Sequence, residues 1–409
     1  LAIAIRAVNA YEKPSLSGLD GLAPVLTVVS RSYPPQVSGS AIVMANLLRN
    51  YAGPVTAIAG YTKYAKSDQA FRSPTPVEYL RLPRFMSSLH DPLVARFPRL
   101  VSQVTIPYMR RGIARNEARV VLSVFPYDDF LVSSFLAARS LGLPSYVYMH
   151  DLWLENVPRN SARFAFARKW EPIVLGGAKR ILCTTEAMQA HYRERYGFAT
   201  ELLPHVIPDQ ELANAPRQIL PEPARDRRIV LFVGDISTYF NRDSLQVLAA
   251  ASELLPPEYE LVFLSPKSKA ELDRAGIRSS RLRTSFVPRE EARRLQREAT
   301  VLVAPLSHKN GTADEVRTVF STKLLEYLIS GRPILVFAPE GSYHATSARD
   351  RWGHVVTDDN PAALAEGIVR VATDYRLAAT LVAGALAEAR RRTASVHAER
   401  LREWVVRDG

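Results

Sequence analysis

Lys323 and Glu326 lie three residues apart in the stretch STKLLEYLISGRPIL, which begins at Ser321. Leucine and isoleucine recur at positions 324, 325, 328 and 329, and this spacing predicts a short helix with one buried face. The lysine and the glutamate would then project from the same side of the helix, one turn or ~5 Å apart. They could hold the phosphates and the ribose hydroxyls of one nucleotide, or they could form a surface pair that contributes a few tenths of a kcal/mol.

The residues around this helix predict how it is positioned. Ser321 or Thr322 is expected to be the N-cap, because a hydroxyl there accepts a hydrogen bond from a free backbone N–H group of the first turn. Gly331 suits the end of the helix, and the apolar run over residues 334–337 predicts a buried strand. The free N–H groups and the ammonium would both face a diphosphate at the start of the helix.

The composition predicts a globular protein of two domains. A chain of 409 residues is long enough for two cores, and 47% apolar with 23% charged residues is ordinary for a globular protein. The single cysteine, Cys183, rules out a disulfide within the chain and a cysteine metal cluster, and it suits a reducing compartment. No stretch approaches the ~20 apolar residues of a membrane-spanning helix. A cytoplasmic location is therefore expected.

The positive charge is concentrated in the segment 81–119. The net charge is +12, and this segment carries eight arginines against two acidic residues. Apolar residues such as Phe97 and Leu100 alternate with the arginines, a pattern that suits an anionic membrane surface but also a solvated face. Nucleic acid would be attracted too, yet no nucleic-acid-binding signature is present, so we expect no nucleic-acid partner. Peripheral attachment to the inner face of the plasma membrane stays open.

Short apolar runs alternate with helical patterns along the chain. Strands are predicted over residues 25–30, 120–125, 146–149 and 181–184, and then over 229–233, 261–264, 284–287, 301–305, 334–337 and 354–356. Alternation of this kind predicts an α/β protein with two Rossmann-like domains, each a doubly wound parallel sheet, facing a central cleft. Ligands of such sheets bind at the carboxyl ends of the strands. Neither G-x-G-x-x-G nor a Walker A sequence is present, which disfavours a dehydrogenase or a P-loop ATPase.

The stretch that begins at Ser321 resembles the P-x-K-x-x-E-Y-x-x-x-G-(K/R)-P-(V/I) segment of family 4 glycosyltransferases, which have the GT-B fold. Five more stretches agree with that family in order and spacing: SYPPQVSGSAIVMANLLRNY, YVYMHDLWLEN, WEPIVLGGAKRILCTTEAMQAHYRERYG, IVLFVGDIS and ALAEGI. The resemblance covers residues 25 to 385. It implies an acceptor-binding domain over 1–208, a linker over 209–228, a nucleotide-sugar-binding domain over 229–385 and a helical tail over 386–409 that packs back on the first domain.

The resemblance also implies an activity. Such an enzyme moves a sugar from a UDP- or GDP-sugar to a glycan, a lipid-linked acceptor or a small molecule, as in the assembly of cell-surface glycans or glycolipids. Configuration would be retained, with the leaving diphosphate taking the acceptor's proton, and neither a metal nor another cofactor is expected. Two alternatives stay open: a sugar-nucleotide epimerase or phosphorylase of the same architecture, and a non-catalytic partner that has kept the fold.

Site residues follow from the same resemblance. The donor would be held by Ser321, Thr322, Lys323 and Glu326, with Gly234 in the glycine turn and the backbone at Pro288 against the base. The catalytic candidates are His150 and Asp151, and Gly39 and Ser40 form the loop near the acceptor and the diphosphate. His150 could equally be a structural histidine, and Asp151 could orient a loop.

Two positions depart from the family pattern. Thr318 stands where the family has the first glutamate of E-x7-E, and Asp235 follows the glycine turn where a basic pair is usual. The remaining cations that could neutralise a diphosphate are Arg242, Lys267 or Lys269, and Arg317.

Overall fold

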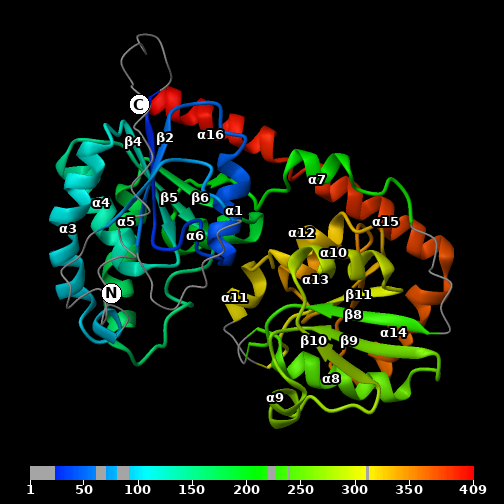
Figure 1. Ribbon diagram of the computed structural model, residues 1–409. Coiled ribbons are helices and arrows are strands. Elements are labelled where there is room, and N and C mark those ends of the chain that lie inside the picture. The colour runs from blue at the N-terminus through cyan, green and yellow to red at the C-terminus, as the bar shows by residue number, and fades with distance from the viewer. Residues whose placement is uncertain (1–23, 61–70, 81–91, 220–226, 238–239, 310–312) are drawn as a thin grey trace, which may run out of the picture. The chain divides into compact units, whose positions relative to one another are not determined.

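The computed structural model describes residues 24–60, 71–80, 92–219, 227–237, 240–309 and 313–409 (Figure 1). The chain forms two compact units. The first comprises the chain up to Leu182 together with Ser395–Gly409, and the second comprises Cys183–Ala394. Two parallel α/β sheets confirm the predicted fold class.

The first sheet has seven strands in the order β3-β2-β1-β4-β5-β6-β7. Their bounds are β1 Leu26–Ser30, β2 Val55–Ala59, β3 Val77–Tyr79, β4 Val120–Phe125, β5 Ser145–Met149, β6 Arg180–Cys183 and β7 Glu201–Leu202. The central strands pair in parallel, with Leu26 opposite both Val55 and Val120. Strands β1 and β4 are buried along their whole length, as their continuous apolar runs predict.

In the part of this half that the structure describes, the helices between the strands are α1 Gly39–Leu48, α3 Pro98–Arg115, α4 Asp128–Ser140, α5 Ala162–Gly177 and α6 Glu186–Tyr196. Several begin at a hydroxyl residue whose side chain accepts a backbone hydrogen bond, namely Ser38 before α1, Ser161 before α5 and Thr185 before α6. Gly197 ends α6 in the left-handed conformation.

The second sheet has six strands in the order β10-β9-β8-β11-β12-β13, all paired in parallel. Their bounds are β8 Arg228–Val233, β9 Tyr259–Leu264, β10 Leu282–Ser285, β11 Val301–Pro305, β12 Ile334–Phe337 and β13 His354–Val356. The last three match the predicted ranges residue for residue. The prediction for β10 is wrong by two residues.

The helices of the second half are α7 Asp209–Ala213, α8 Arg242–Leu254, α9 Lys269–Arg274, α10 Arg289–Glu298, α11 Ala313–Thr318, α12 Lys323–Leu328, α13 Tyr343–Ala348, α14 Pro361–Thr373, α15 Tyr375–Arg390 and α16 Ala394–Asp408. Helix α7 lies inside the segment 209–228 that the sequence suggests as a linker. Within the part of the chain that the structure describes, we find no helix with both the length and the apolarity to cross a bilayer.

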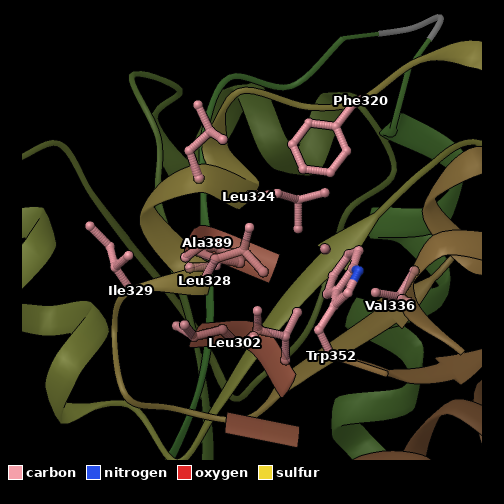
Figure 2. Packing of buried hydrophobic residues seen from close by; sticks show 14 of the residues in the cluster. Leu302, Phe320, Leu324, Leu328, Ile329, Val336, Trp352 and Ala389 are labelled. Atoms are coloured by element: carbon pink, nitrogen blue, oxygen red, sulfur yellow. The ribbon is translucent and has the colours of Figure 1, made fainter. Parts of the chain in front are cut away.

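Helix α12 is fixed by the core of the second unit (Figure 2). Leu324 and Leu328 are buried and belong to the same cluster as Leu302, Val336 and Trp352. Each buried side chain of this size contributes about 1.5–3 kcal/mol. The predicted apolar stripe is thus confirmed, and it holds the charged side of the short helix in a defined place.

The C-terminal helix α16 is part of the first unit. The guanidinium of Arg180 donates to both carboxylate oxygens of Asp408, at 2.6 and 3.1 Å. The hydroxyl of Tyr146, on β5, donates to the same carboxylate at 2.6 Å. Tail and sheet are therefore joined by a charge-assisted network.

Candidate functional site

The strand β8 ends in a glycine turn that receives the lysine side chain. Gly234 has a backbone φ of 150°, which residues with a side chain rarely adopt. A Cβ atom at this position would overlap the Cδ and Cε of Lys323 and would lie 3.1 Å from its Nζ. Two residues named separately from the sequence are thus in contact, and the absence of a side chain at position 234 is what lets the lysine lie against the turn.

The electrostatic surroundings of Lys323 are mixed. The residue keeps solvent-exposed surface, yet the protein around it desolvates the ammonium and lowers its pKa. The charges of Asp235 and Glu326 oppose this shift because they favour the charged form. An incoming anion would favour the charged form further. Asp235, which replaces a basic residue of the family pattern, therefore acts on Lys323.

Two hydrogen bonds attach the segment Ser321–Tyr327 to the rest of the second unit. The hydroxyl of Tyr327 accepts from the N–H of Val233 at 2.9 Å, so α12 is anchored directly beside the glycine turn. The N–H of Ser321 donates to Nε2 of His344 at 3.1 Å. Burial lowers the pKa of His344 to about 4, which keeps the ring neutral and able to accept.

Glu326 is held by side chains of α10. Nε of Arg289 donates to its Oε1 at 2.8 Å, and Nε2 of Gln296 donates to its Oε2 at 3.2 Å. Arg293 lies 3.7 Å from Oε1 and pairs in turn with Glu211 of α7 at 2.7 Å. Burial raises the pKa of the Glu326 carboxyl, but the arginines and the hydrogen bonds outweigh it and hold the pKa below its ordinary value. Glu326 is thus an ionised group with 20% of its side chain exposed.

The predicted hydroxyl cap is wrong. Thr322 occupies the N-cap position of α12, but its backbone is already helical and its side chain makes no cap hydrogen bond. The helix has only six residues, so its aligned peptide dipoles are few. Lysine, and not the helix end, is the main source of positive charge at this place. Gly331 behaves as predicted, with a φ of 75° just past the helix.

The other predicted cations are engaged elsewhere in the second unit. Nε of Arg242, the first residue of α8, donates to the carbonyl of Ala275 at 3.1 Å. Lys267 lies 3.9 Å from Glu271, and Lys269 donates to Asp273 at 2.9 Å. Pro288 is the residue before α10, so it starts the helix that carries Arg289.

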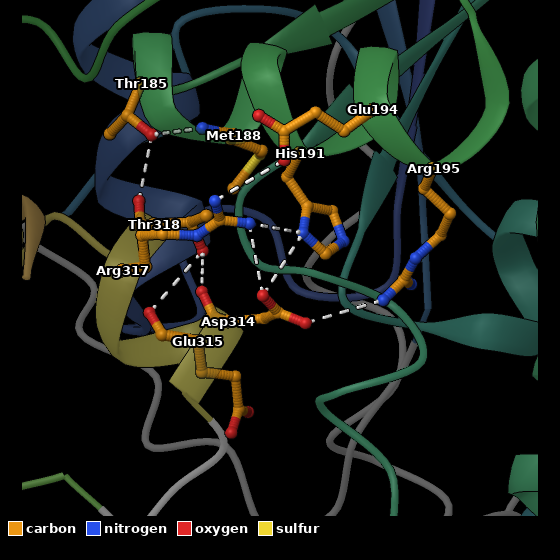
Figure 3. A network of polar contacts seen from close by, with 9 residues as sticks. All are labelled: Thr185, Met188, His191, Glu194, Arg195, Asp314, Glu315, Arg317 and Thr318. Atoms are coloured by element: carbon orange, nitrogen blue, oxygen red, sulfur yellow. Dashed lines mark hydrogen bonds and ion pairs between the residues drawn. The ribbon is translucent and has the colours of Figure 1, made fainter.

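Arg317 belongs to a polar network between α6 and α11 (Figure 3). Its guanidinium lies 3.1 Å from Asp314 and 3.5 Å from Glu194, and it is 3.4 Å from Nδ1 of His191. Arg195 also reaches Asp314, at 3.7 Å. These contacts account for the charge of Arg317 without a ligand.

Thr318 is buried within the same network. Its hydroxyl donates to the carbonyl of Asp314 at 2.9 Å, and its own carbonyl accepts from the hydroxyl of Thr185. The side chain that replaces the family's glutamate is therefore turned back on its own helix.

At the first sheet the structure brings two further predicted residues together. His150 follows β5, and its Nδ1 lies 3.1 Å from the hydroxyl of Ser40 on α1. Burial lowers the pKa of His150 to about 3, so the ring is neutral. Gly39 faces open space, since a Cβ there would meet no atom within 4 Å. Asp151 is half-buried beside His150.

Sequence reasoning missed the residues that hold the site in shape. Arg289, Gln296 and His344 each contact a predicted donor residue, and Tyr327 contacts Val233, the residue before Gly234. Only Tyr327 had a signal, because it stands next to the glutamate in the family segment. A surface hollow of about 580 Å³ lies elsewhere, lined by Glu253, Lys269, Asp273, Arg278, Ser279 and Ser280. The glycine turn is the stronger candidate for the donor site, because charge and backbone geometry converge there.

Two Rossmann-like parallel sheets in one chain match the architecture of GT-B glycosyltransferases. Family models agree in both halves of the chain. The model of "Glycosyltransferase Family 4" matches residues 65–210, and that of "Glycosyl transferases group 1" matches residues 227–374. Together they match well over half of the sequence. The chain belongs to the family 4 type of GT-B glycosyltransferases and is an enzyme of that class.

Solved structures share this fold. HepE from Anabaena, in complex with UDP and glucose, is 14% identical with a TM-score of 0.66, and the match covers 93% of this chain and 99% of that one. Sucrose-phosphate synthase from Thermosynechococcus elongatus is 15% identical with a TM-score of 0.64, over 93% and 98% of the two chains. The lipopolysaccharide outer core galactosyltransferase WaaB is 12% identical with a TM-score of 0.59, over 92% and 97%. No curated protein sequence matches the chain.

Proposed function

We propose that this glycosyltransferase uses a UDP-sugar and holds the donor diphosphate with Lys323 at the turn of Gly234. The observation that carries the proposal is the contact between these two residues at the carboxyl end of β8. Nucleotides of such sheets bind at that edge, and a glycine there lets phosphate oxygens approach the backbone. UDP is favoured over GDP because structures of HepE with this fold were solved with UDP, UDP and glucose, and UDP-glucose.

Glu326 is proposed to accept hydrogen bonds from the ribose. A carboxylate has about four acceptor positions, and among the described residues Oε2 of Glu326 receives only the Gln296 amide. Arg289 and Gln296 fix the orientation of the group before the ligand arrives. A pre-oriented carboxylate loses less conformational entropy on binding.

Transfer is proposed to proceed with retention and without a metal. The reaction develops negative charge on the leaving diphosphate, which a positioned cation stabilises. Lys323, whose charged form Asp235 and Glu326 favour, is proposed to supply this stabilising charge. The neutral His150 and the Ser40 hydroxyl would contact the acceptor or the transferred sugar, with Asp151 orienting their loop. NMR of the product's anomeric proton tests retention, and undiminished turnover in excess EDTA tests metal independence.

The acceptor is proposed to be a glycan or lipid-linked sugar at the inner face of the plasma membrane. Helix α3 and the residues before it support contact with anionic lipid, because Arg99, Arg110 and Arg111 are exposed along with Phe97 and Leu100, which are 49% and 57% exposed. The predicted residues Arg81, Arg84 and Asp91 lie outside the described residues.

Flotation with vesicles that contain anionic lipid tests this contact. Arg110→Glu with Arg111→Glu should abolish flotation, whereas Arg274→Glu with Arg278→Glu on the second unit should leave it unchanged. Equal flotation of both double variants would count against the membrane proposal.

The donor proposal is tested by thermal shift and calorimetry with UDP, GDP and UDP-glucose. Lys323→Met should weaken UDP binding about 10- to 100-fold, since a hydrogen bond to a charged group contributes about 1.5–3 kcal/mol. Glu326→Gln should weaken UDP but not pyrophosphate, which lacks a ribose. Lys269→Met, at a lysine paired with Asp273, is the matched control. Wild-type affinity in Lys323→Met would refute the site.

A further inference from the structure

The residue just before the proposed donor segment is stacked under a buried arginine. The guanidinium carbon of Arg392 lies 4.0 Å from the ring centroid of Phe320, which immediately precedes Ser321. The arginine is 3% exposed and the ring 4% exposed. A cation in contact with an aromatic face at this distance, shielded from water, interacts more strongly than at an exposed site.

Arg392 also belongs to the segment through which the chain connects its two sheets. The chain leaves the first sheet after β7, and Ile207 lies on the way to β8. The N–H of Ile207 donates to the carbonyl of Arg392 at 2.7 Å, and the N–H of Ala394 donates to the carbonyl of Ile207 at 3.0 Å. After Ala394 the chain returns to the first unit. Both connections are thus hydrogen-bonded to each other at the backbone of Arg392.

Stability alone is a poor reason for an arginine at this position. Its Nε donates to Glu388 at 3.0 Å, but Glu388 also receives Arg351 at 3.3 Å and Arg391 at 3.8 Å. The carboxylate of Glu388 is therefore shared by three guanidinium groups. Among the described residues, Nη1 of Arg392 has no hydrogen-bond partner. Replacing a buried ion pair as a whole by apolar side chains of similar volume is often neutral or stabilising, so a buried ion pair is weak evidence for a role in stability.

We infer that Arg392 is a positioning residue for donor binding. Its side chain holds Phe320, and its backbone is bonded to Ile207. Arg392 thereby fixes the segment Ser321–Glu326 relative to the two connecting segments at Ile207 and Arg392. This inference rests on the proposed function, because it takes that segment to hold the donor. Phe320 is also edge-on to His344, whose Nε2 accepts from the N–H of Ser321. The stack therefore reaches the donor segment both along the chain and through the histidine.

Arg392→Met tests the inference by separating affinity from stability. The melting temperature should stay near that of the wild type, because Glu388 keeps Arg351 and Arg391 as partners. The Kd of UDP and the KM of the UDP-sugar should rise about threefold to thirtyfold, which is the range expected from a cation–π contact. The kcat should change less than KM. Arg391→Met is the matched control, since Arg391 shares Glu388 but is 68% exposed; it should bind UDP as the wild type does.

Phe320→Leu provides the second measurement, because it keeps an apolar side chain and removes only the ring. It should weaken UDP binding as Arg392→Met does, and the double variant should be no weaker than either single variant. Unchanged UDP affinity in a folded Arg392→Met or Phe320→Leu protein would overturn the inference, as would losses that simply add in the double variant. If Lys323→Met loses UDP while Arg392→Met keeps it, only this inference fails; if Lys323→Met keeps UDP, the proposed function fails as well.

Discussion

Two groups of predicted site residues, one at the carboxyl end of each sheet, differ in charge. At the first edge the described pair, His150 and Ser40, is neutral and shielded, and the histidine has a pKa of about 3. At the second edge Lys323 and Glu326 are charged and keep exposed surface. A neutral pair suits hydroxyl groups of a sugar, whereas charged side chains suit a diphosphate and its ribose. In the proposed function, the first group therefore contacts the acceptor or the transferred sugar, and the second holds the nucleotide.

The largest effect is expected from adding a methyl group at Gly234, which lies against Lys323. Gly234→Ala must adopt a φ of 150° and displace the Lys323 side chain, so it should lower stability by about 1–3 kcal/mol and reduce UDP affinity at least about tenfold. Urea unfolding and calorimetry measure the two effects. Gly142→Ala is the control, because its φ of 68° is also unfavourable but its Cβ would meet no atom. It should lose stability and keep UDP affinity; if both variants bind UDP normally, the glycine–lysine contact has no role in the donor site.

A second prediction concerns how the stability of the protein depends on pH through the neutral ring of His150. Burial lowers the pKa of His150 from 6.5 to about 3, so between these values the unfolded chain takes up a proton that the folded chain does not. Stability therefore falls as the pH falls from 6.5 toward 3, by about 2 kcal/mol between pH 7 and pH 5 for this group. His150→Gln should remove that part of the loss in urea unfolding, and above pH 7 the two proteins should share one pH dependence. An unaltered acid sensitivity would mean that His150 is not the buried neutral ring described here.

The smallest effect is expected from the hydroxyl that faces this histidine. Ser40→Ala removes one hydrogen bond, of about 1 kcal/mol. It should raise the KM of the acceptor severalfold and leave the Kd of UDP unchanged, because Ser40 lies on the first unit. If the Kd of UDP changed more than the KM of the acceptor, Ser40 would belong to the donor site and not to the acceptor site.

Most strands were predictable because a strand that is buried on both faces is a continuous run of apolar residues. The ranges of β11 and β12 follow from unbroken apolar runs between polar loops. The strands β2, β3 and β7 were missed; β3 and β7 have only three and two residues, and β3 is half-buried throughout. Edge strands of two or three residues carry too few side chains for a periodic signal.

The site was predictable as residue types but not as geometry. Lys323, Glu326, Gly234, His150 and Ser40 could each be named, yet the Lys323–Gly234 and His150–Ser40 contacts join positions about 90 and 110 residues apart. The orientation of Glu326 depends on how α10 packs beside α12, which no local pattern encodes. The hydroxyl cap failed because the backbone of Thr322 is already helical, and such a residue cannot fold its oxygen back onto the first turn.

The bond between Arg180 and Asp408 has a practical consequence for dissecting the enzyme. A fragment that stops at Leu182 would lack helix α16, which belongs to the same unit. A fragment that starts at Cys183 would carry α16 without the sheet on which it packs. Producing the first sheet alone calls for a recombinant gene that joins Ser395–Gly409, through a short glycine-rich linker, to a segment extended past β7, since β6 and β7 run beyond Leu182.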